Sequence, residues 1–398
     1  MDRNPPLPIR NETRELIERL VAFDTTSRNS NLGLIEWVRD HLRHLGVESR
    51  LTYDTTAKKA NLFATLGGGT RPGIVLSGHT DVVPVDGQDW QTDPFKATLQ
   101  GDRYLGRGVA DMKGFIAVAL GMAPKFLAAP LKAPVHFALS YDEEVGCLGV
   151  RGLIDDLAKV RIKPAGCIVG EPTSMEVVVA HKGKRSYECC VTGREAHSAL
   201  TPQGVNAIEY AARLIVHIRH MADRLRDCEA RDALFDVPFT TLQTGTITGG
   251  TAVNIVPREC TFRFEFRYLP GADPQALENE IRAFATRTLL PEMRAVHPSA
   301  SIEIATSSEI PGLNMRDDDR LTYLATALSR GKPAETGERY GKVAYATEAG
   351  LFQVAGIPSI ICGPGSIEQA HKPNEFITLE QIARCEAFME RLTAELCR

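Results

Sequence analysis

Three short apolar segments constrain the fold of this chain more than any other feature. They are GIVLSGH (73–79), APVHFALS (133–140) and GCIVG (166–170), and each has the length and composition of a strand buried on both faces. Helical spacing of apolar residues marks the segments 12–24 and 32–46 that precede them. Because strands that alternate with helices build sheets covered by helices, the pattern predicts an α/β fold with a mixed, mainly parallel sheet flanked by helices.

The pattern changes in the middle of the chain. Four strand-like and two helical segments follow in the order β-α-β-β-α-β, with strands at 184–193, 240–250, 259–268 and 299–308 and helices at 206–225 and 274–290. Such a unit commonly folds as a ferredoxin-like, two-layer α+β domain. The α/β alternation then returns, with a strand at 357–363 and a closing helix at 379–396. We therefore expect a larger domain formed by residues 1–182 and 308–398, with a smaller domain inserted at 183–307.

Composition narrows the classes of partner. The formal net charge of -4 and the lack of a basic tract argue against nucleic-acid binding, so a small molecule is the expected partner. No apolar stretch reaches the roughly 18 residues of a membrane span. The nine cysteines are scattered and form no CxxC pair, which is typical of a reduced, cytoplasmic protein. Any bound metal is therefore expected to have histidine and carboxylate ligands.

The first candidate site lies in GHTDVVP, directly after an apolar segment. A neutral imidazole such as that of His79 is a good zinc ligand, and Asp81 is suited to accept the other ring N–H and so hold the ring in place. The alternative is an ordinary Asp-containing turn after a strand.

Two further segments carry acids. In GRGVADMKG, Asp111 precedes the helical run FIAVALGM, and its two oxygens could bridge two cations or cap the helix. In YDEEVG (141–146), three adjacent acids follow an apolar segment, and their mutual repulsion is costly unless a cation neutralises it. A solvated acidic loop is the alternative for this segment.

Glu171 in GEPT and His371 in GPGSIEQAHKPNE each follow another apolar strand. Most of these candidates thus lie just after strands, and ligand sites of open α/β sheets lie outside the carboxyl ends of strands. Two histidines and three carboxylates suffice for two divalent ions that share Asp111, at a separation of roughly 3.5 to 4 Å. The donor set favours zinc, with manganese or cobalt as alternatives. One acid of the DEE run remains as a general base, which would deprotonate the attacking water and later protonate the leaving amine.

The motifs HTDVVP, GRGxxDMKG, DEE, GEPT and AHKPNE occur in this order around an inserted domain, and they resemble the M20 family of metallopeptidases and deacylases over essentially the whole chain. The resemblance implies an amide hydrolase with two metal ions. It also implies the ligands, which are His79, Asp111 and Glu171 for one metal and Asp111, Glu144 and His371 for the other. Glu143 would be the general base, and Asp81 would be the partner of His79.

For the inserted domain, the resemblance implies a lid that closes over the substrate and forms a homodimer interface. GREAHSALTPQGVNAI is similar to the lid segment whose histidine reaches the partner subunit's active site, so His197 is expected to donate to the oxyanion in trans. GGTAVNIVP and FEFRYLP place Asn254 and Arg267 where relatives bind the substrate carboxylate, a task that suits the guanidinium fork of Arg267.

Within the family, GPGSIEQAHKP and YATEAGLF are most similar to members that deacetylate acetylornithine. This implies hydrolysis of N2-acetyl-L-ornithine to acetate and L-ornithine, a step of arginine biosynthesis. Glu348 is expected to attract the substrate ammonium, and the alternative is a surface glutamate that caps the following helix. The other functions left open are hydrolysis of succinyl-diaminopimelate, of other N-acylamino acids or of small dipeptides, and a non-catalytic dimeric binding protein of the same fold.

Overall fold

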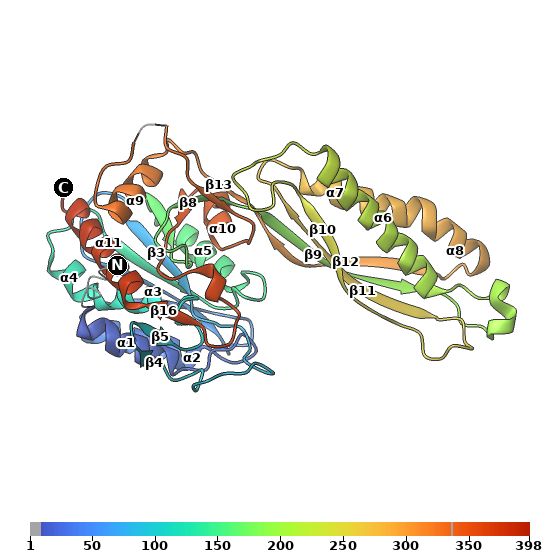
Figure 1. The fold of residues 1–398 in the computed structure, drawn as a ribbon, viewed down its shortest axis with the longest axis horizontal. Helices are drawn as coiled ribbons and strands as arrows, with labels where there is room; N and C mark the ends of the chain where they lie inside the picture. Colours follow the sequence, from blue (N-terminus) through green and yellow to red (C-terminus); the bar gives the residue numbers. More distant parts are fainter. Residues whose placement is uncertain (1–8, 336) are drawn as a thin grey trace. The chain divides into compact units, whose positions relative to one another are not determined.

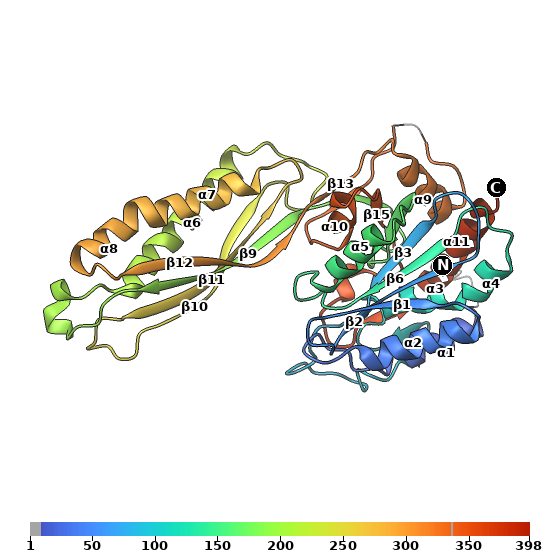
Figure 2. The same cartoon turned by 180° about the vertical axis from the view of Figure 1, so that it is seen from behind.

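The computed structural model describes residues 9–335 and 337–398, and these form two compact units. The first unit contains the chain up to Ala180 together with Leu313–Gly341 and Thr347–Arg398. The second unit contains His181–Gly312 and Lys342–Ala346. Figures 1 and 2 show these units from opposite sides, each with a sheet and helices of its own.

The described part of the first unit is built on a nine-stranded sheet, in which β14 pairs with β8 off the path β1-β2-β6-β3-β7-β15-β8-β13. The strand bounds are β1 Ser49–Tyr53, β2 Ala60–Leu66, β3 Ile74–His79, β6 Val135–Ser140, β7 Gly166–Val169, β8 Val178–His181, β13 Leu313–Asn314, β14 Gly341–Val343 and β15 Ser359–Ile361. The central strands β6, β3, β7 and β15 are parallel. The pairs β1·β2, β2·β6 and β15·β8 are antiparallel, so the predicted mixed sheet is confirmed.

The three apolar segments of the sequence form β3, β6 and β7, and all residues of these strands are buried. Helices cover the sheet on both sides, with α3 and α11 in front of it in Figure 1 and α5 in front of it in Figure 2. The helices of this unit are α1 Asn11–Val21, α2 Leu32–His44, α3 Lys113–Gly121, α4 Ala123–Ala128, α5 Gly149–Lys159, α9 Arg320–Arg330, α10 Ala349–Val354 and α11 Leu379–Leu396. Because the central strands run in one direction, their carboxyl ends meet at one edge of the sheet.

A small three-stranded sheet joins distant parts of the first unit. Strand β16 (Phe376–Thr378) pairs antiparallel with β5 (Arg103–Leu105), and β5 pairs with β4 (Thr98–Gln100). Strand β16 begins shortly after His371, and β5 ends shortly before Asp111. The pairing therefore brings together the two segments that carry these predicted ligands.

The second unit is a four-stranded antiparallel sheet in the order β10-β11-β9-β12. Its elements are β9 Gly183–Thr192, α6 Ala207–Cys228, β10 Thr241–Gly249, β11 Glu259–Tyr268, α7 Pro274–Phe284, the π-helical turn η2 Ala285–Leu289, α8 Leu290–Val296 and β12 Ser301–Ile310. Burial alternates along β11, so alternate side chains form the core beneath the helices. This β-α-β-β-α-β order is the one that the sequence pattern predicts.

The limits of the second unit differ from the predicted insertion at 183–307. Strand β12 continues to Ile310, which pairs with Lys184 of β9, and the inserted segment of this unit runs from His181 to Gly312. Residues 342–346 also belong to this unit. Among the described residues, no helix combines the length and apolarity needed to cross a bilayer.

Candidate metal centre

The first ligand group gathers around His79, the last residue of β3. Its Nε2 lies 3.0 Å from Oδ1 of Asp111 and 3.9 Å from Oε1 of Glu171. One potential ligand atom from each of these buried residues lies within 4.8 Å of the other two. The structure thus brings together the first predicted ligand set.

The second group contains Asp111, Glu144 and His371. Nε2 of His371 lies 3.0 Å from Oε2 of Glu144 and 3.6 Å from Oδ2 of Asp111. Asp111 therefore turns Oδ1 toward His79 and Oδ2 toward His371, which is the geometry needed to bridge two cations. The alternative of a helix cap is wrong, because α3 has Met112 at its N-cap position and no side chain caps it.

Strand order explains why residues so far apart in sequence meet. His79 ends β3, Glu144 follows β6, Glu171 follows β7 and His371 lies beyond β15, and these four strands are adjacent and parallel. His371 comes only after the short 3-10 helix η3 (Ile367–Gln369), and its φ of 64° lies in the left-handed region. A non-glycine residue adopts this conformation only where its surroundings hold it.

The site concentrates carboxylates in a buried place. Burial raises the pKa of Glu143 and of Glu171 well above the usual value, and neighbouring carboxylates raise both further. Burial acts in the same direction on Asp111, but the hydrogen bond to His79 and the charges of His79 and His371 outweigh it and lower the pKa of Asp111. Divalent cations would supply the missing positive charge, and a donor set of two imidazoles and three carboxylates fits zinc.

Asp81 organises the centre in a way that differs from the prediction. Its carboxylate accepts hydrogen bonds from the amides of Glu143 (3.1 Å) and Glu144 (3.3 Å) and from the hydroxyl of Ser27 (2.7 Å). Nδ1 of His79 lies 3.7 Å from this carboxylate but 2.9 Å from the backbone oxygen of Asp81. A carbonyl oxygen only accepts, so Nδ1 carries the proton and the Nε2 lone pair is available to a cation. The side chain instead holds the loop of the two glutamates.

The run YDEEVG is not the solvated acidic loop that was the alternative. The side chain of Glu144 is 7% exposed, and the carboxylate of Glu143 accepts a hydrogen bond of 3.3 Å from the thiol of Cys147. Burial, together with the charge of Glu143, raises the pKa of this thiol well above its usual value, so the thiol stays protonated and donates. The sequence interpretation missed Cys147 and Ser27; for Cys147, the only signal was its position four residues after Glu143.

A model of the peptidase family M20/M25/M40 matches residues 75–395. The chain belongs to this family. The acetylornithine deacetylase of Proteus mirabilis (strain HI4320) is 35% identical over 377 residues, which cover 94% of this chain and 93% of the relative. The acetylornithine deacetylase of Myxococcus xanthus is 35% identical over 390 residues, which cover 96% of this chain and 97% of the relative.

A solved M20 family structure has the same fold. The metallo-carboxypeptidase Sso-CP2 from Sulfolobus solfataricus superposes with a TM-score of 0.76 at 17% identity, over 98% of this chain and all of that one (100%). Family membership and the predicted class of enzyme, a hydrolase acting on amide bonds, are thereby confirmed.

In this M20 chain, two predicted residues of the second unit lie on neighbouring loops. His197 directly precedes the 3-10 helix η1 (Ser198–Gln203), and its Nδ1 accepts a hydrogen bond of 3.0 Å from the amide of Ala199. In the neutral ring the proton then lies on Nε2, which is left as a donor. The amide of Ser198 donates to the backbone oxygen of Asn254 at 3.1 Å, so the two loops are tied together.

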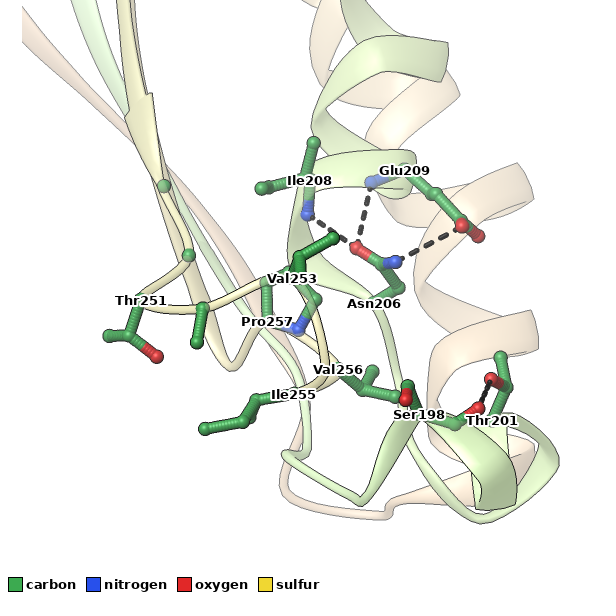
Figure 3. Close-up of a pocket in the computed structure, with 13 residues that line it drawn as sticks. Ser198, Thr201, Asn206, Ile208, Glu209, Thr251, Val253, Ile255, Val256 and Pro257 are labelled. Carbon is green, nitrogen blue, oxygen red and sulfur yellow. Dashed lines mark hydrogen bonds between the residues drawn. The ribbon is translucent and has the colours of Figure 1, made fainter.

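A cavity of about 530 Å³ opens beside these loops, within the second unit. Figure 3 shows Asn206 on one wall, where it caps α6 by accepting from the amides of Ile208 (3.1 Å) and Glu209 (3.2 Å). The segment 249–257 forms the opposite wall, and its Val253 side chain is fully exposed. The predicted metal ligands do not line this cavity.

Arg267 lies at the other end of the β10·β11 hairpin from Asn254. It is paired in register with Thr241 and Lys184, whereas Asn254 lies in the loop that joins β10 to β11. Its Nε donates to Oε1 of Glu265 at 3.1 Å. Eight residue steps separate Glu259, at the start of β11, from Arg267, which is roughly 27 Å. Within one chain, the structure therefore does not bring Asn254 and Arg267 together.

The structure overturns the alternative interpretation of Glu348 as a surface cap. Its side chain is 1% exposed and makes no capping hydrogen bond to α10, so it is not a surface cap. Oε2 accepts from the hydroxyl of Ser77 at 3.5 Å, and burial raises the pKa of Glu348 to about 7. The Glu348 carboxylate lies near the expected base, because its charge contributes to the raised pKa of Glu143. Contact between Glu348 and a substrate ammonium stays a prediction.

Proposed function

We propose that this chain uses two zinc ions to hydrolyse N2-acetyl-L-ornithine to acetate and L-ornithine, a step of arginine biosynthesis, as a cytoplasmic homodimer. The metal dependence rests on one observation, the position of the Asp111 carboxylate between His79 and His371. The choice of substrate is supported by the curated relatives named acetylornithine deacetylase, which match nearly the whole chain. Manganese and cobalt are the alternative metals for the same donor set.

The residues of the first unit provide the acid–base chemistry. Bound divalent cations would polarise the scissile carbonyl and lower the pKa of water. Glu143 takes the proton from the attacking water and returns it to the leaving nitrogen, and a raised pKa suits a group that must both accept and donate near neutral pH. Asp81 holds the backbone of Glu143 and Glu144 through their amides, which fixes the base relative to the ligands.

The second unit provides substrate contacts and acts as the lid and dimer interface in this proposal. The Nε2–H of His197 donates to the oxyanion, a contribution of about 10²- to 10³-fold in rate. Arg267 and Asn254 bind the substrate carboxylate. Because the loops of His197 and Asn254 lie roughly 27 Å from Arg267 along the hairpin, one acylamino acid contacts both sets only if they come from two copies of the chain. This separation supports action of His197 in trans.

Metal analysis combined with kinetics tests the proposal. Metal-free protein is reloaded with Zn²⁺, Co²⁺ or Mn²⁺, and kcat/KM is measured for acetylornithine, succinyl-diaminopimelate, acetylmethionine and a dipeptide. We expect two metal ions per chain and the highest kcat/KM on acetylornithine. Glu143→Gln is the matched control, because it keeps every proposed ligand and removes the base.

Other outcomes reassign the function. A higher kcat/KM on one of the other three substrates would identify a different deacylase or dipeptidase with the same centre, because specificity depends on a few pocket contacts. Fewer than one metal per chain and no turnover of any substrate would favour a non-catalytic dimeric binding protein.

A further inference from the structure

Glu375 is a buried acid near the candidate metal centre, and it has no role in the proposed reaction. It lies four residues after His371 and is 1% exposed. Its Oε1 accepts hydrogen bonds from the amides of Ala110 (2.8 Å) and Asp111 (3.1 Å). Its Oε2 accepts from the amide of Gly108 (2.9 Å) and from Nη1 of Arg107 (2.8 Å). One carboxylate thus holds almost every residue of the loop that presents Asp111.

The backbone of Glu375 strengthens the same connection. Its carbonyl oxygen accepts from the amide of Gly106 at 3.0 Å, and β16, which starts at the next residue, pairs with β5 through Phe376 and Leu105. The side chain of Glu375, its carbonyl oxygen and the strand that follows it therefore all join the segment of His371 to the segment that carries Asp111. These two segments supply two of the three ligands of the second group.

Arg107 extends this network to the backbone of His371. Its side chain is 1% exposed, and its Nη2 donates to Oε1 of Gln88 at 2.6 Å. Nε2 of Gln88 donates in turn to the backbone oxygen of His371 at 2.9 Å. Hydrogen bonds thus link Glu375 to Arg107, Gln88 and the backbone of His371, and the backbone from 371 to 375 closes the ring. This network restrains the left-handed backbone of His371, a conformation that needs external support.

We propose that Glu375 is a positioning residue that sets the separation of Asp111 and His371 and thereby the affinity of the second metal position. The inference rests on the proposed dinuclear centre and adds to it a residue that touches neither metal nor substrate. Groups that orient ligands from outside the coordination sphere typically change metal affinity by about 10- to 100-fold when they are replaced.

Glu375→Gln tests this role with little change of shape. A glutamine has one accepting oxygen, and its NH₂ group would face two of the four donors that now point at the carboxylate. Glu386→Gln is the matched control. Glu386 is also buried and accepts from the amide of Arg10 (3.1 Å) and the hydroxyl of Thr13 (2.5 Å), and neither partner belongs to a ligand-bearing loop.

The readout is titration of the metal-free, full-length protein with Co²⁺, followed by absorbance and calorimetry. In Glu375→Gln the second equivalent should bind about 10- to 100-fold more weakly than in wild type, and the first equivalent should be less affected. In Glu386→Gln both equivalents should bind as in wild type. For Glu375→Gln we further expect kcat to fall while KM for acetylornithine stays near the wild-type value, because no substrate contact is removed.

Uptake of both equivalents by Glu375→Gln with wild-type affinity would overturn the proposal. If Glu375→Gln does not fold, Gln88→Ala replaces it in the test, because it removes the link to His371 and leaves Glu375 in place. Weaker binding of the second Co²⁺ equivalent would then support the role, and unchanged binding would contradict it. A wild type that binds two equivalents but cleaves none of the four substrates would refute only the proposed function. A wild type that binds fewer than two equivalents would refute both.

Discussion

The thiol of Cys147 donates to the carboxylate of Glu143, and this single contact bears on the acid–base step. A donor stabilises the ionised form of a carboxylate, so its loss should raise the pKa of Glu143. We expect Cys147→Ala to move the acidic limb of the pH profile of kcat/KM to higher pH. The measurement is a profile from pH 5 to pH 9 on the metal-loaded enzyme.

Cys147→Ser provides the opposite change at the same position. A hydroxyl is a stronger donor than a thiol, so the acidic limb should shift to lower pH or stay at the wild-type position. A shift of both variants in the same direction would mean that packing around position 147, and not the hydrogen bond, controls the base.

The burial of His136 in β6 leads us to expect a pH dependence of folding stability that is unrelated to catalysis. Its ring stacks on Phe63 and its Nδ1 lies 3.0 Å from the hydroxyl of Thr65, and burial lowers the pKa of His136 to about 4. In the unfolded chain the pKa of His136 is near 6.5. The stability contributed by the neutral, buried ring is therefore fully present above pH 6.5 and is lost as the pH falls toward 4, because in this range only the unfolded chain takes up the proton. The loss amounts to about 3 kcal/mol.

Replacement of this ring tests the sign of the effect. In metal-free protein, His136→Gln should lose less stability than wild type between pH 7 and pH 4, measured by urea unfolding followed by circular dichroism. Equal losses in the two proteins would show that other groups dominate the acid response.

At the scale of elements, α3 packs closely on the end of β7, and this contact fixes the backbone position of the following residue, Glu171. A Cβ atom built on Gly170 would lie 2.1 Å from the ring of Phe115 in α3, so the helix or the strand end would have to move. We expect Gly170→Ala to destabilise the protein by about 1–3 kcal/mol and to weaken metal binding through the neighbouring Glu171. Thermal unfolding with and without Zn²⁺ measures both effects.

Gly152 in α5 is the matched control for this packing argument. Its nearest neighbour for an added Cβ is Thr52 at 3.4 Å, which is ordinary contact. Gly152→Ala should leave metal binding unchanged and stabilise the helix by roughly 0.5–1 kcal/mol. Similar destabilisation of both variants would remove the link between Gly170 and the metal centre.

At the scale of the whole molecule, the separation of Asn254 from Arg267 predicts complementation between chains. His197→Ala lacks the oxyanion donor, and Glu143→Gln lacks the base. If His197 acts in trans, a mixed dimer has one complete site, so refolding equal amounts of the two inactive variants together should restore about a quarter of wild-type activity. Activity no higher than the sum of the separate variants would show that His197 acts within its own chain.

Much of the fold and the choice of candidate ligands could be predicted from local patterns. Uniformly apolar runs identified β3, β6 and β7, and parallel strands that end at one edge of a sheet bring the side chains that follow them together. Strand direction and residue type were therefore enough to propose the candidate ligands. Their division into two groups was implied by the resemblance to the M20 family. Helix limits also depend on local turns. The spacing predicts a helix over 12–24, but α1 ends at Val21, and in the turn that follows the side chain of Asp24 accepts from the amide of Thr26.

The partners of the buried acids were decided only when distant segments packed against each other. Sequence spacing suggested Asp81 as the partner of His79 and left a surface cap as the alternative for Glu348. In the structure, the Asp81 carboxylate accepts from two amides and Glu348 is buried. Arg107 and Glu375 are 268 positions apart, and no periodicity links them. Side-chain period and strand direction are set within short windows of sequence, whereas the atom that a buried carboxylate meets depends on the three-dimensional register of the whole sheet.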